Sequence, residues 1–87
     1  MQIGTAEALG QYLRDRRRAA GLTQSDLATR AQVSRRWLSD LESGKPTAEI
    51  GLVFRVVSAL GLFIDLRSVA PPDIDLDAYL DGLGTAP

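Results

Sequence analysis

The amino-acid sequence predicts an all-α domain of four to five helices that ends in a single β-strand. Three observations support this fold class. Two short apolar-periodic segments, each preceded by a good N-cap residue, are separated by only two residues. Longer segments with helical periodicity lie on either side of this pair, at residues 5–20 and 48–60. The stretch that follows, residues 62–69, changes to a two-residue period, which is typical of a strand.

The first helix is predicted to begin at Thr5 and to end at about residue 20. Thr5 can serve as its N-cap, and Glu7 is favourable in the first turn because carboxylates are stabilised at a helix N-terminus. Gly21 closes the helix, as a glycine often does just beyond a helix end. Leu9 and Leu13 lie one turn apart and mark its buried face.

Residues 22–44 are the centre of the prediction because they have the spacing of a helix-turn-helix. Thr23 is a suitable N-cap, and Asp26 three positions later completes a capping box. Ser34 offers the N-cap of the next helix, and Gly44 ends that helix as a C′ glycine. Because only two residues separate the helices, the pair must cross rather than run antiparallel. The second helix can then enter the major groove of DNA.

The outward face of this second helix has the composition of a base-reading surface. Cations are electrostatically disfavoured at a helix N-terminus, yet two adjacent arginines occupy the first turn, which indicates a polyanionic ligand. The candidates for base contacts are Arg35, Arg36, Trp37, Ser39 and Asp40. The alternative for the arginines is a solvated charged face, the usual explanation of surface arginines. Trp37 could pack on the DNA backbone or thymine methyl groups, or it could clamp the helix against the turn at Pro46.

This segment resembles a known family of DNA-binding domains. The Xre-family repressors, related to the phage Cro and cI proteins, have a pattern similar to Thr23-Gln24, Leu27-Ala28, Val33-Ser34, Leu38-Ser39, Leu41-Glu42 and Gly44. The resemblance covers most of residues 7–61 and implies a lambda-repressor-like fold. The continuation over residues 44–49 and 56–66 narrows the resemblance to HipB-type antitoxins. The sequence departs from the family at Gln32, a turn position where glycine is common, and a left-handed conformation there would cost about 1 kcal/mol.

The resemblance implies roles for further side chains. An arginine at the position of Arg17 commonly pairs with a glutamate at the position of Glu42, which implies a partly buried ion pair between the first helix and the recognition helix. Contacts to the phosphate backbone are implied for Gln24, Ser34, Lys45 and Thr47. HipB-type antitoxins also bind and neutralise a HipA-type toxin kinase, and the two together repress their own operon. This second activity follows from the resemblance alone.

A fourth helix is predicted over residues 48–60, after the turn at Pro46 and with Thr47 as its cap. Its core face has helical spacing and consists of Ile50, Val53, Phe54, Val57 and Leu60. A second apolar stripe beside that face consists of Leu52, Val56 and Ala59. A domain this small cannot cover both stripes, so the second stripe is predicted to lie in a homodimer interface. The alternative is a deeply buried helix in a tight monomer.

Residues 62–69 form the strand candidate of the chain. A lone strand needs a hydrogen-bonding partner, and in a two-fold dimer that partner is its own copy. HipB-like proteins are built this way, so the resemblance supports the same interface here. Charge pairing favours a register in which Asp65 faces Arg67 of the other chain. The apolar side of the strand, which joins the predicted interface, comprises Leu62, Ile64 and Leu66.

Charge is distributed unevenly along the 87 residues, whose net charge is −1. Residues 1–70 contain all ten Lys and Arg against seven acids, a net charge of +3, whereas residues 71–87 contain four Asp and no base, a net charge of −4. This asymmetry indicates two different partners. We therefore divide the chain into a DNA-binding and dimerisation domain, residues 1–70, and an acidic, flexible tail, residues 71–87. The tail is either frayed or folds when it docks on a partner protein.

Composition excludes several classes of protein. The chain has no cysteine, so it has neither a disulfide framework nor a Cys-based zinc site. We expect neither a signal peptide nor a membrane span, and we expect a cytoplasmic protein. Without histidine, cysteine, a glycine-rich phosphate loop or an evident carboxylate pair, it is predicted not to be an enzyme and to need no cofactor or metal.

The predicted function is sequence-specific repression by a symmetric dimer on a palindromic operator, with the two recognition helices about 34 Å apart. Within this prediction, the HipB-like antitoxin of a type II toxin–antitoxin pair competes with a stand-alone Xre-type repressor that has no toxin partner. The alternative from another class is a helical protein-interaction adaptor that does not bind DNA.

Overall fold

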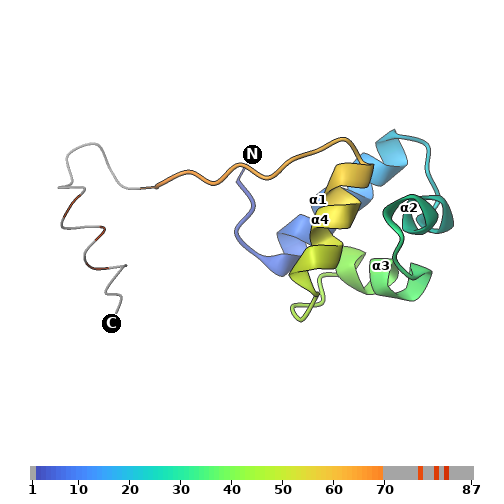
Figure 1. The fold of residues 1–87 in the computed structure, drawn as a ribbon, viewed down its shortest axis with the longest axis horizontal. Coiled ribbons are helices and arrows are strands. Elements are labelled where there is room, and N and C mark those ends of the chain that lie inside the picture. Colours follow the sequence, from blue (N-terminus) through green and yellow to red (C-terminus); the bar gives the residue numbers. More distant parts are fainter. Residues whose placement is uncertain (1, 70–76, 78–79, 81, 83–87) are drawn as a thin grey trace.

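The computed structural model describes residues 2–69 together with residues 77, 80 and 82. Over residues 2–69 the chain forms α1 (Ala6–Ala19), α2 (Gln24–Ala31), α3 (Arg35–Glu42) and α4 (Ile50–Ala59). Helix α2 packs on α3 and α4, and α1 packs on α3 (Figure 1). The side chains buried completely in the core come from all four helices and are Leu13, Leu27, Leu38 and Val56. The predicted all-α class is confirmed, with four helices over residues 2–69.

Three helices begin at the predicted N-cap residues. The hydroxyls of Thr5, Thr23 and Ser34 each accept a hydrogen bond of 3.0 Å from the backbone N–H three residues later. The carboxylate of Asp26 accepts a reciprocal 3.0 Å hydrogen bond from the Thr23 N–H, which completes the capping box. These bonds satisfy backbone donors that a helix start leaves without an intrahelical acceptor. The starts of α1, α2 and α3 are therefore fixed by local contacts.

The start of α4 differs from the prediction. The helix begins at Ile50 rather than at residue 48, and its N-cap is Glu49, which makes no side-chain capping hydrogen bond. Residues 46 and 47 form a turn, and Ala48 then packs against the core. Thr47 is therefore exposed in the turn and is not the cap of this helix.

The predicted core face of α4 is wrong in part. Val53, Val56 and Val57 are buried, whereas Ile50 is 65% exposed and Phe54 is 49% exposed. The buried positions still have helical spacing, but the face is rotated from the one predicted. The reason is that α4 packs on α2, and its apolar residues extend around most of its circumference, so their spacing is compatible with more than one buried face.

The rotation of α4 also changes the predicted dimer interface. Val56 is 0% exposed, so it belongs to the protomer's own core and cannot contact a partner. Ala59 and Leu62 are partly buried and pack against the same core. Leu52 is partly buried, and Ile64 and Leu66 are exposed. Of the six residues predicted for the interface, three therefore contribute to the core of a single chain.

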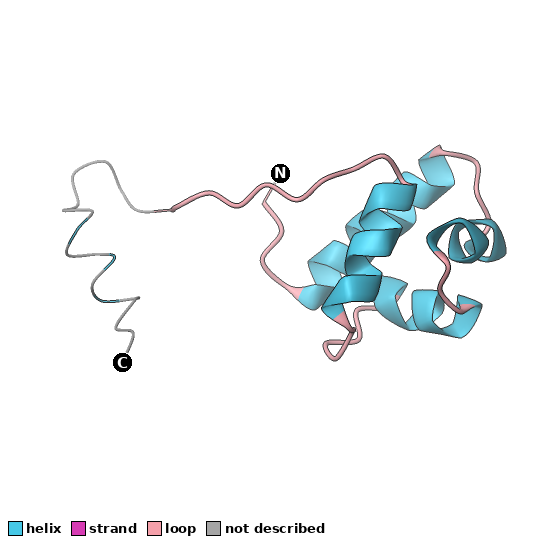
Figure 2. Ribbon diagram, viewed as in Figure 1, coloured by secondary structure: helices cyan, strands magenta, loops and turns pink. Residues whose placement is uncertain are grey.

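Residues 62–69 are not a strand in this structure. They form an extended segment that leaves the helical domain beyond α4 (Figure 2). A strand requires backbone hydrogen bonds to a neighbouring strand, and the described part of the chain offers none. Within the segment, Arg67 Nε donates to Asp65 Oδ2 of the same chain at 2.7 Å, so the charge pair predicted across two chains forms locally here.

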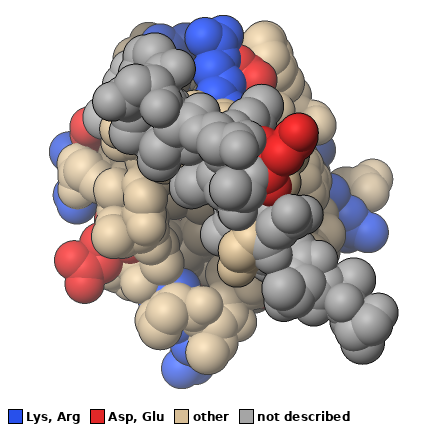
Figure 3. All heavy atoms as spheres, turned by 90° about the vertical axis from the view of Figure 1, so that its left-hand side faces the viewer, with Lys and Arg blue, Asp and Glu red and all other residues tan. Residues whose placement is uncertain are grey.

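The extended segment has a mostly apolar surface. Phe63 is 85% exposed, Leu66 89% and Val69 74%. Figure 3 shows the molecule from the side on which the segment projects, with charged side chains of both signs visible among the tan residues. The predicted acidic tail lies outside the described residues apart from 77, 80 and 82. None of the helices in the described part of the chain has both the length and the apolar character that a membrane span requires.

Candidate nucleic-acid interface

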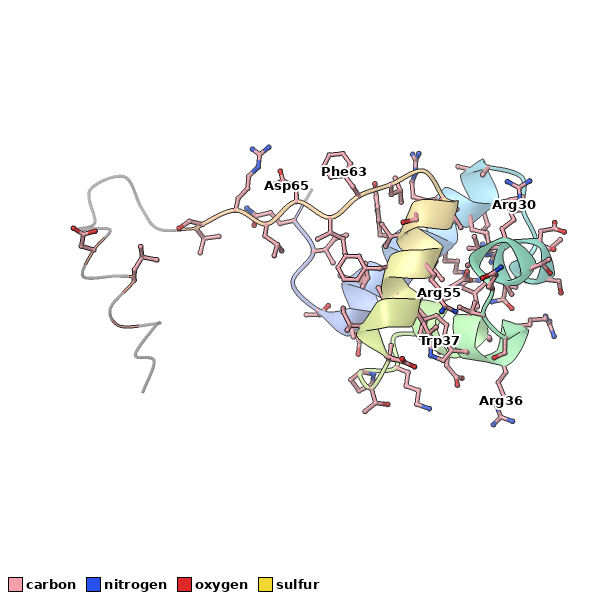
Figure 4. All side chains as sticks on the ribbon, in the orientation of Figure 1. Arg30, Arg36, Trp37, Arg55, Phe63 and Asp65 are labelled. Atoms are coloured by element: carbon pink, nitrogen blue, oxygen red, sulfur yellow. The ribbon has the colours of Figure 1, made fainter. Side chains whose placement is uncertain are left out.

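The N-terminal half of α3 presents two arginines to solvent. Arg35 and Arg36 are exposed in its first turn, which contains no acidic residue, and Arg36 points away from the domain (Figure 4). Within the described residues, neither guanidinium has a hydrogen-bond or ion-pair partner. Ser39 is exposed one turn further along, and Asp40 is partly exposed. The helix therefore offers free donors at the end where the positive helix dipole repels cations.

The opposite face of α3 is fixed by the core. Leu38 is 0% exposed and Leu41 is 4% exposed. Trp37 is partly buried and packs against the core, with its ring on the side of α3 that faces α4 (Figure 4). The indole thus helps to hold α3 on the core, and its contact with DNA stays a prediction. Helix α3 is thus anchored to the core through Trp37, Leu38 and Leu41.

Two glycines allow α3 to approach α1 closely. A Cβ at Gly10 would collide with the Leu41 carbonyl oxygen and lie 3.0 Å from that of Glu42. A Cβ at Gly44, whose φ is +91°, would lie 2.9 Å from Glu7 Cα. Sequence reasoning identified Gly44 and missed Gly10. The signal that could have identified Gly10 is its position inside a predicted helix. A glycine there costs about 1 kcal/mol relative to alanine, so its presence indicates a packing role.

The ion pair implied by the family resemblance is present. Arg17 Nε donates to Glu42 Oε2 at 2.7 Å and Nη2 donates to Oε1 at 2.9 Å, while the two residues are only 7% and 6% exposed. The third guanidinium nitrogen, Nη1, donates to the Leu22 carbonyl at 2.8 Å. The hydrogen bond to Glu42 raises the pKa of Arg17 above its ordinary value. One guanidinium therefore joins α1, the loop before α2 and the end of α3.

Gln24, predicted to touch phosphate, belongs to the same network. Its Nε2 donates to Glu42 Oε1 at 3.1 Å. A primary amide has two N–H groups, so one remains for another acceptor. Gln24 is the first residue of α2, beside the end of α1, and its side chain is therefore oriented by the buried ion pair.

The turn between α2 and α3 has the left-handed conformation that its family position suggests. Gln32 has φ 57° and ψ 46°. Among the described residues it is the one non-glycine residue with a positive φ. Arg55 of α4 donates from Nη1 to the Gln32 carbonyl at 3.2 Å. This contact holds the turn against α4 and offsets part of the roughly 1 kcal/mol cost of the conformation. The crossing angle of the helix pair depends on this turn.

The loop after α3 supplies the other flank of the surface. Lys45 Nζ lies 3.8 Å from Asp40 Oδ2, and both side chains are substantially exposed, so the pair is weak. Lys45 and Thr47 are exposed, as is Ser34 at the start of α3. The structure thus brings most of the predicted DNA contacts to α3 and its two ends, while Trp37 is directed to the core.

Comparisons with known proteins agree with this geometry. Residues 8–70 match the family model of the helix-turn-helix domain. An uncharacterised HTH-type transcriptional regulator, y4mF of Sinorhizobium fredii (strain NBRC 101917 / NGR234), is 43% identical over 65 residues, which cover 75% of this chain and 86% of the relative. The fold is similar to solved structures of a HipB-O4 20mer complex and a HipA-HipB-O2-O3 complex, each with TM-score 0.75, 21% identity, and coverage of 80% of this chain and 99% of the matched chain. The chain belongs to the helix-turn-helix family of DNA-binding transcription regulators.

Proposed function

We propose that this regulator is a sequence-specific repressor that binds a palindromic operator as a symmetric dimer. The observation that supports the proposal is a pair of exposed arginines in the first turn of α3, which have no side-chain partner among the described residues, on a helix anchored to the core. A rigid helix is needed because base recognition depends on side chains held at fixed positions in the major groove. The protein is a regulator and not an enzyme.

The arginines are assigned to base contacts. A guanidinium can donate two hydrogen bonds to O6 and N7 of guanine, which is the commonest specific contact in the major groove. Arg35 and Arg36 take this role in our proposal, and Ser39 and Asp40 read neighbouring base edges. Residues at the ends of α3 and at the start of α2 contact the phosphate backbone and so hold the recognition helix in register. These residues are Gln24, Ser34, Lys45 and Thr47.

The dimer is proposed to form through the extended segment. The segment exposes the large apolar side chains of Phe63, Leu66 and Val69 to solvent, which is unfavourable for an isolated chain. Pairing with the same segment of a second copy would cover these side chains, because antiparallel strands related by a two-fold axis place them against each other. The two α3 helices would then lie about 34 Å apart, one helical repeat of DNA.

The finer proposal is that the protein is a HipB-like antitoxin that neutralises a HipA-like kinase and represses its own operon. The solved structures of similar fold include a HipB-O4 20mer complex and a HipA-HipB-O2-O3 complex. The charge asymmetry adds support, since the −4 charge of residues 71–87 suits a partner other than DNA. A stand-alone repressor is the second candidate, and the presence of a kinase-like gene beside this one distinguishes the two.

The test of DNA binding is retardation of the gene's own upstream region by the purified chain at several salt concentrations. A DNA-binding regulator loses affinity steeply as salt increases, because phosphate contacts release counterions. A protein-interaction adaptor would show no such dependence and no retardation. Co-purification of the chain with the product of the adjacent gene tests the antitoxin role. A pair that co-elutes and retards the DNA together supports it, and separate elution contradicts it.

A further inference from the structure

A polar depression lies between α1, α2 and α3, beside the recognition helix. Its floor is the buried Arg17–Glu42 pair. Its rim is formed by side chains from all three helices, namely Arg14, Arg18, Gln24, Ser39 and Ser43. Neither Arg14 nor Arg18 belongs to the helix-turn-helix itself, because both are on α1.

The depression has an excess of positive charge. On its floor the guanidinium of Arg17 and the carboxylate of Glu42 are joined by two hydrogen bonds, so their charges compensate each other. On the rim, Arg14 and Arg18 have no hydrogen-bond or ion-pair partner among the described residues. The surrounding side chains therefore leave two uncompensated positive charges around one concave surface.

Two neutral groups on the rim can donate hydrogen bonds into the depression. Gln24 uses one N–H for Glu42, and its amide has a second. The exposed hydroxyl of Ser39 has no side-chain partner within the described residues. Ser43 differs, because its hydroxyl already donates to the Asp40 carbonyl at 2.9 Å. Two cations and two neutral donors around a concave surface suit an oxyanion with several acceptor oxygens.

The position of the depression beside the recognition helix favours a DNA phosphate as that oxyanion. A helix in the major groove has one phosphate backbone on each side, since the groove is only about 12 Å wide. On α3, Asp40 lies on the side of Lys45, and Ser39 lies on the side of α1. The loop at Lys45 thus borders one side of the recognition helix, and the depression borders the other.

We propose that this depression is a binding site for DNA phosphate, in which Arg14 and Arg18 of α1 neutralise the backbone of the strand on the α1 side. The inference rests on the proposed function and extends the DNA footprint beyond the helix-turn-helix. The contacts fix the register of α3 in the groove and carry no base information. The buried Arg17–Glu42 pair acquires a second role, because it orients Gln24 toward the same phosphate.

The test compares Arg14→Gln and Arg18→Gln with the matched control Arg16→Gln. Arg16 is exposed on the same helix and has the same charge, but it does not line the depression. Affinity for a labelled duplex of the upstream region and for a scrambled duplex of equal length is measured by fluorescence anisotropy over a range of KCl concentrations. Arg14→Lys and Arg18→Lys retain the charge, and a melting curve verifies the fold of every variant.

The expected result is a smaller slope of log K against log [KCl] for each Gln variant in the depression. The decrease should be roughly 0.9 per lost phosphate contact, or about twice that for a symmetric dimer. Both duplexes should be affected alike, the Lys variants should retain the wild-type slope, and Arg16→Gln should change it little. Equal slopes for all three Gln variants would overturn the site and leave the DNA-binding function standing. Absence of any salt-dependent binding by the wild-type chain would instead overturn the function.

Discussion

The guanidinium of Arg17 and the carboxylate of Glu42 meet in two parallel hydrogen bonds, 2.7 and 2.9 Å long, between the C-terminal half of α1 and the last residue of α3. Both side chains are nearly buried, at 9% and 3% exposure. Because Arg17 also donates to the carbonyl of Leu22, the pair fixes the recognition helix relative to both helices that precede it. The orientation of the proposed DNA-binding surface thus depends on an ion pair that is nearly buried.

Removing either partner of this pair should destabilise the fold. Arg17→Ala or Glu42→Ala leaves the other charge buried without compensation, and we expect each to lower the free energy of unfolding by about 3–5 kcal/mol. The double variant should lose less than the sum of the single losses, because it buries no unpaired charge. Urea or thermal unfolding of the three variants and the wild type measures the coupling. Additive losses would show that the two side chains do not interact.

The capping box of α2 should make stability depend on pH in the acidic range. Hydrogen bonds from the Thr23 backbone and hydroxyl lower the pKa of Asp26 below its ordinary value of 3.8. Because the pKa is lower in the folded state, the unfolded chain binds the proton first, and the stabilisation is complete above pH 3.8 and lost as pH falls through the folded pKa. Asp26→Ala should therefore be less stable than wild type at neutral pH, and the difference should vanish in strong acid. A difference that is constant with pH would contradict this origin.

Gly10 should tolerate no side chain. In Gly10→Ala the new Cβ would collide with the Leu41 carbonyl, and we expect a loss of about 1–3 kcal/mol in unfolding free energy despite the better helix propensity of alanine. Gly51→Ala in α4 is the matched control, since a Cβ there meets nothing within 4 Å. That variant should gain up to about 1 kcal/mol. Similar changes at both sites, measured by thermal unfolding, would disprove the close contact between α1 and α3.

Arg35 and Lys45 should affect DNA binding in different ways. Arg35→Ala should cost about 1–3 kcal/mol on the operator and relax the preference at one base pair, because it removes a base contact. Lys45→Ala should weaken operator and scrambled DNA alike, because it removes a backbone contact. Affinities of both variants for a set of single-base operator variants separate the two roles. The assignment would be withdrawn if both substitutions weakened every duplex by the same factor.

Leu66 should contribute to the dimer and not to the protomer fold. It is 89% exposed, so Leu66→Asp leaves the core intact, and we expect the variant to shift the monomer–dimer equilibrium strongly toward the monomer. Sedimentation equilibrium measures the shift. Thr29→Asp, at an exposed position on α2, is the control and should leave the equilibrium unchanged. A wild-type chain that is monomeric at all concentrations would favour the tight-monomer alternative.

Local signals in the sequence predicted the helix starts that position the proposed DNA-binding surface. Thr5, Thr23 and Ser34 cap the helices as expected, because each hydroxyl bonds to an N–H only three residues away. Helix α3 therefore begins where the pattern indicates, and Arg35 and Arg36 follow in its first turn. Such contacts are contained within one turn of the chain, so they need no knowledge of the remaining structure.

Contacts between distant segments were decided only by the tertiary structure. Helix α4 is apolar around most of its circumference, and packing on α2 selected Val56 for the core and left Phe54 half exposed. The close approach at Gly10 and the absence of a strand over residues 62–69 depend in the same way on neighbours that no short pattern specifies. The physical reason is that burial and strand pairing are properties of two surfaces in contact, whereas periodicity describes only one of them.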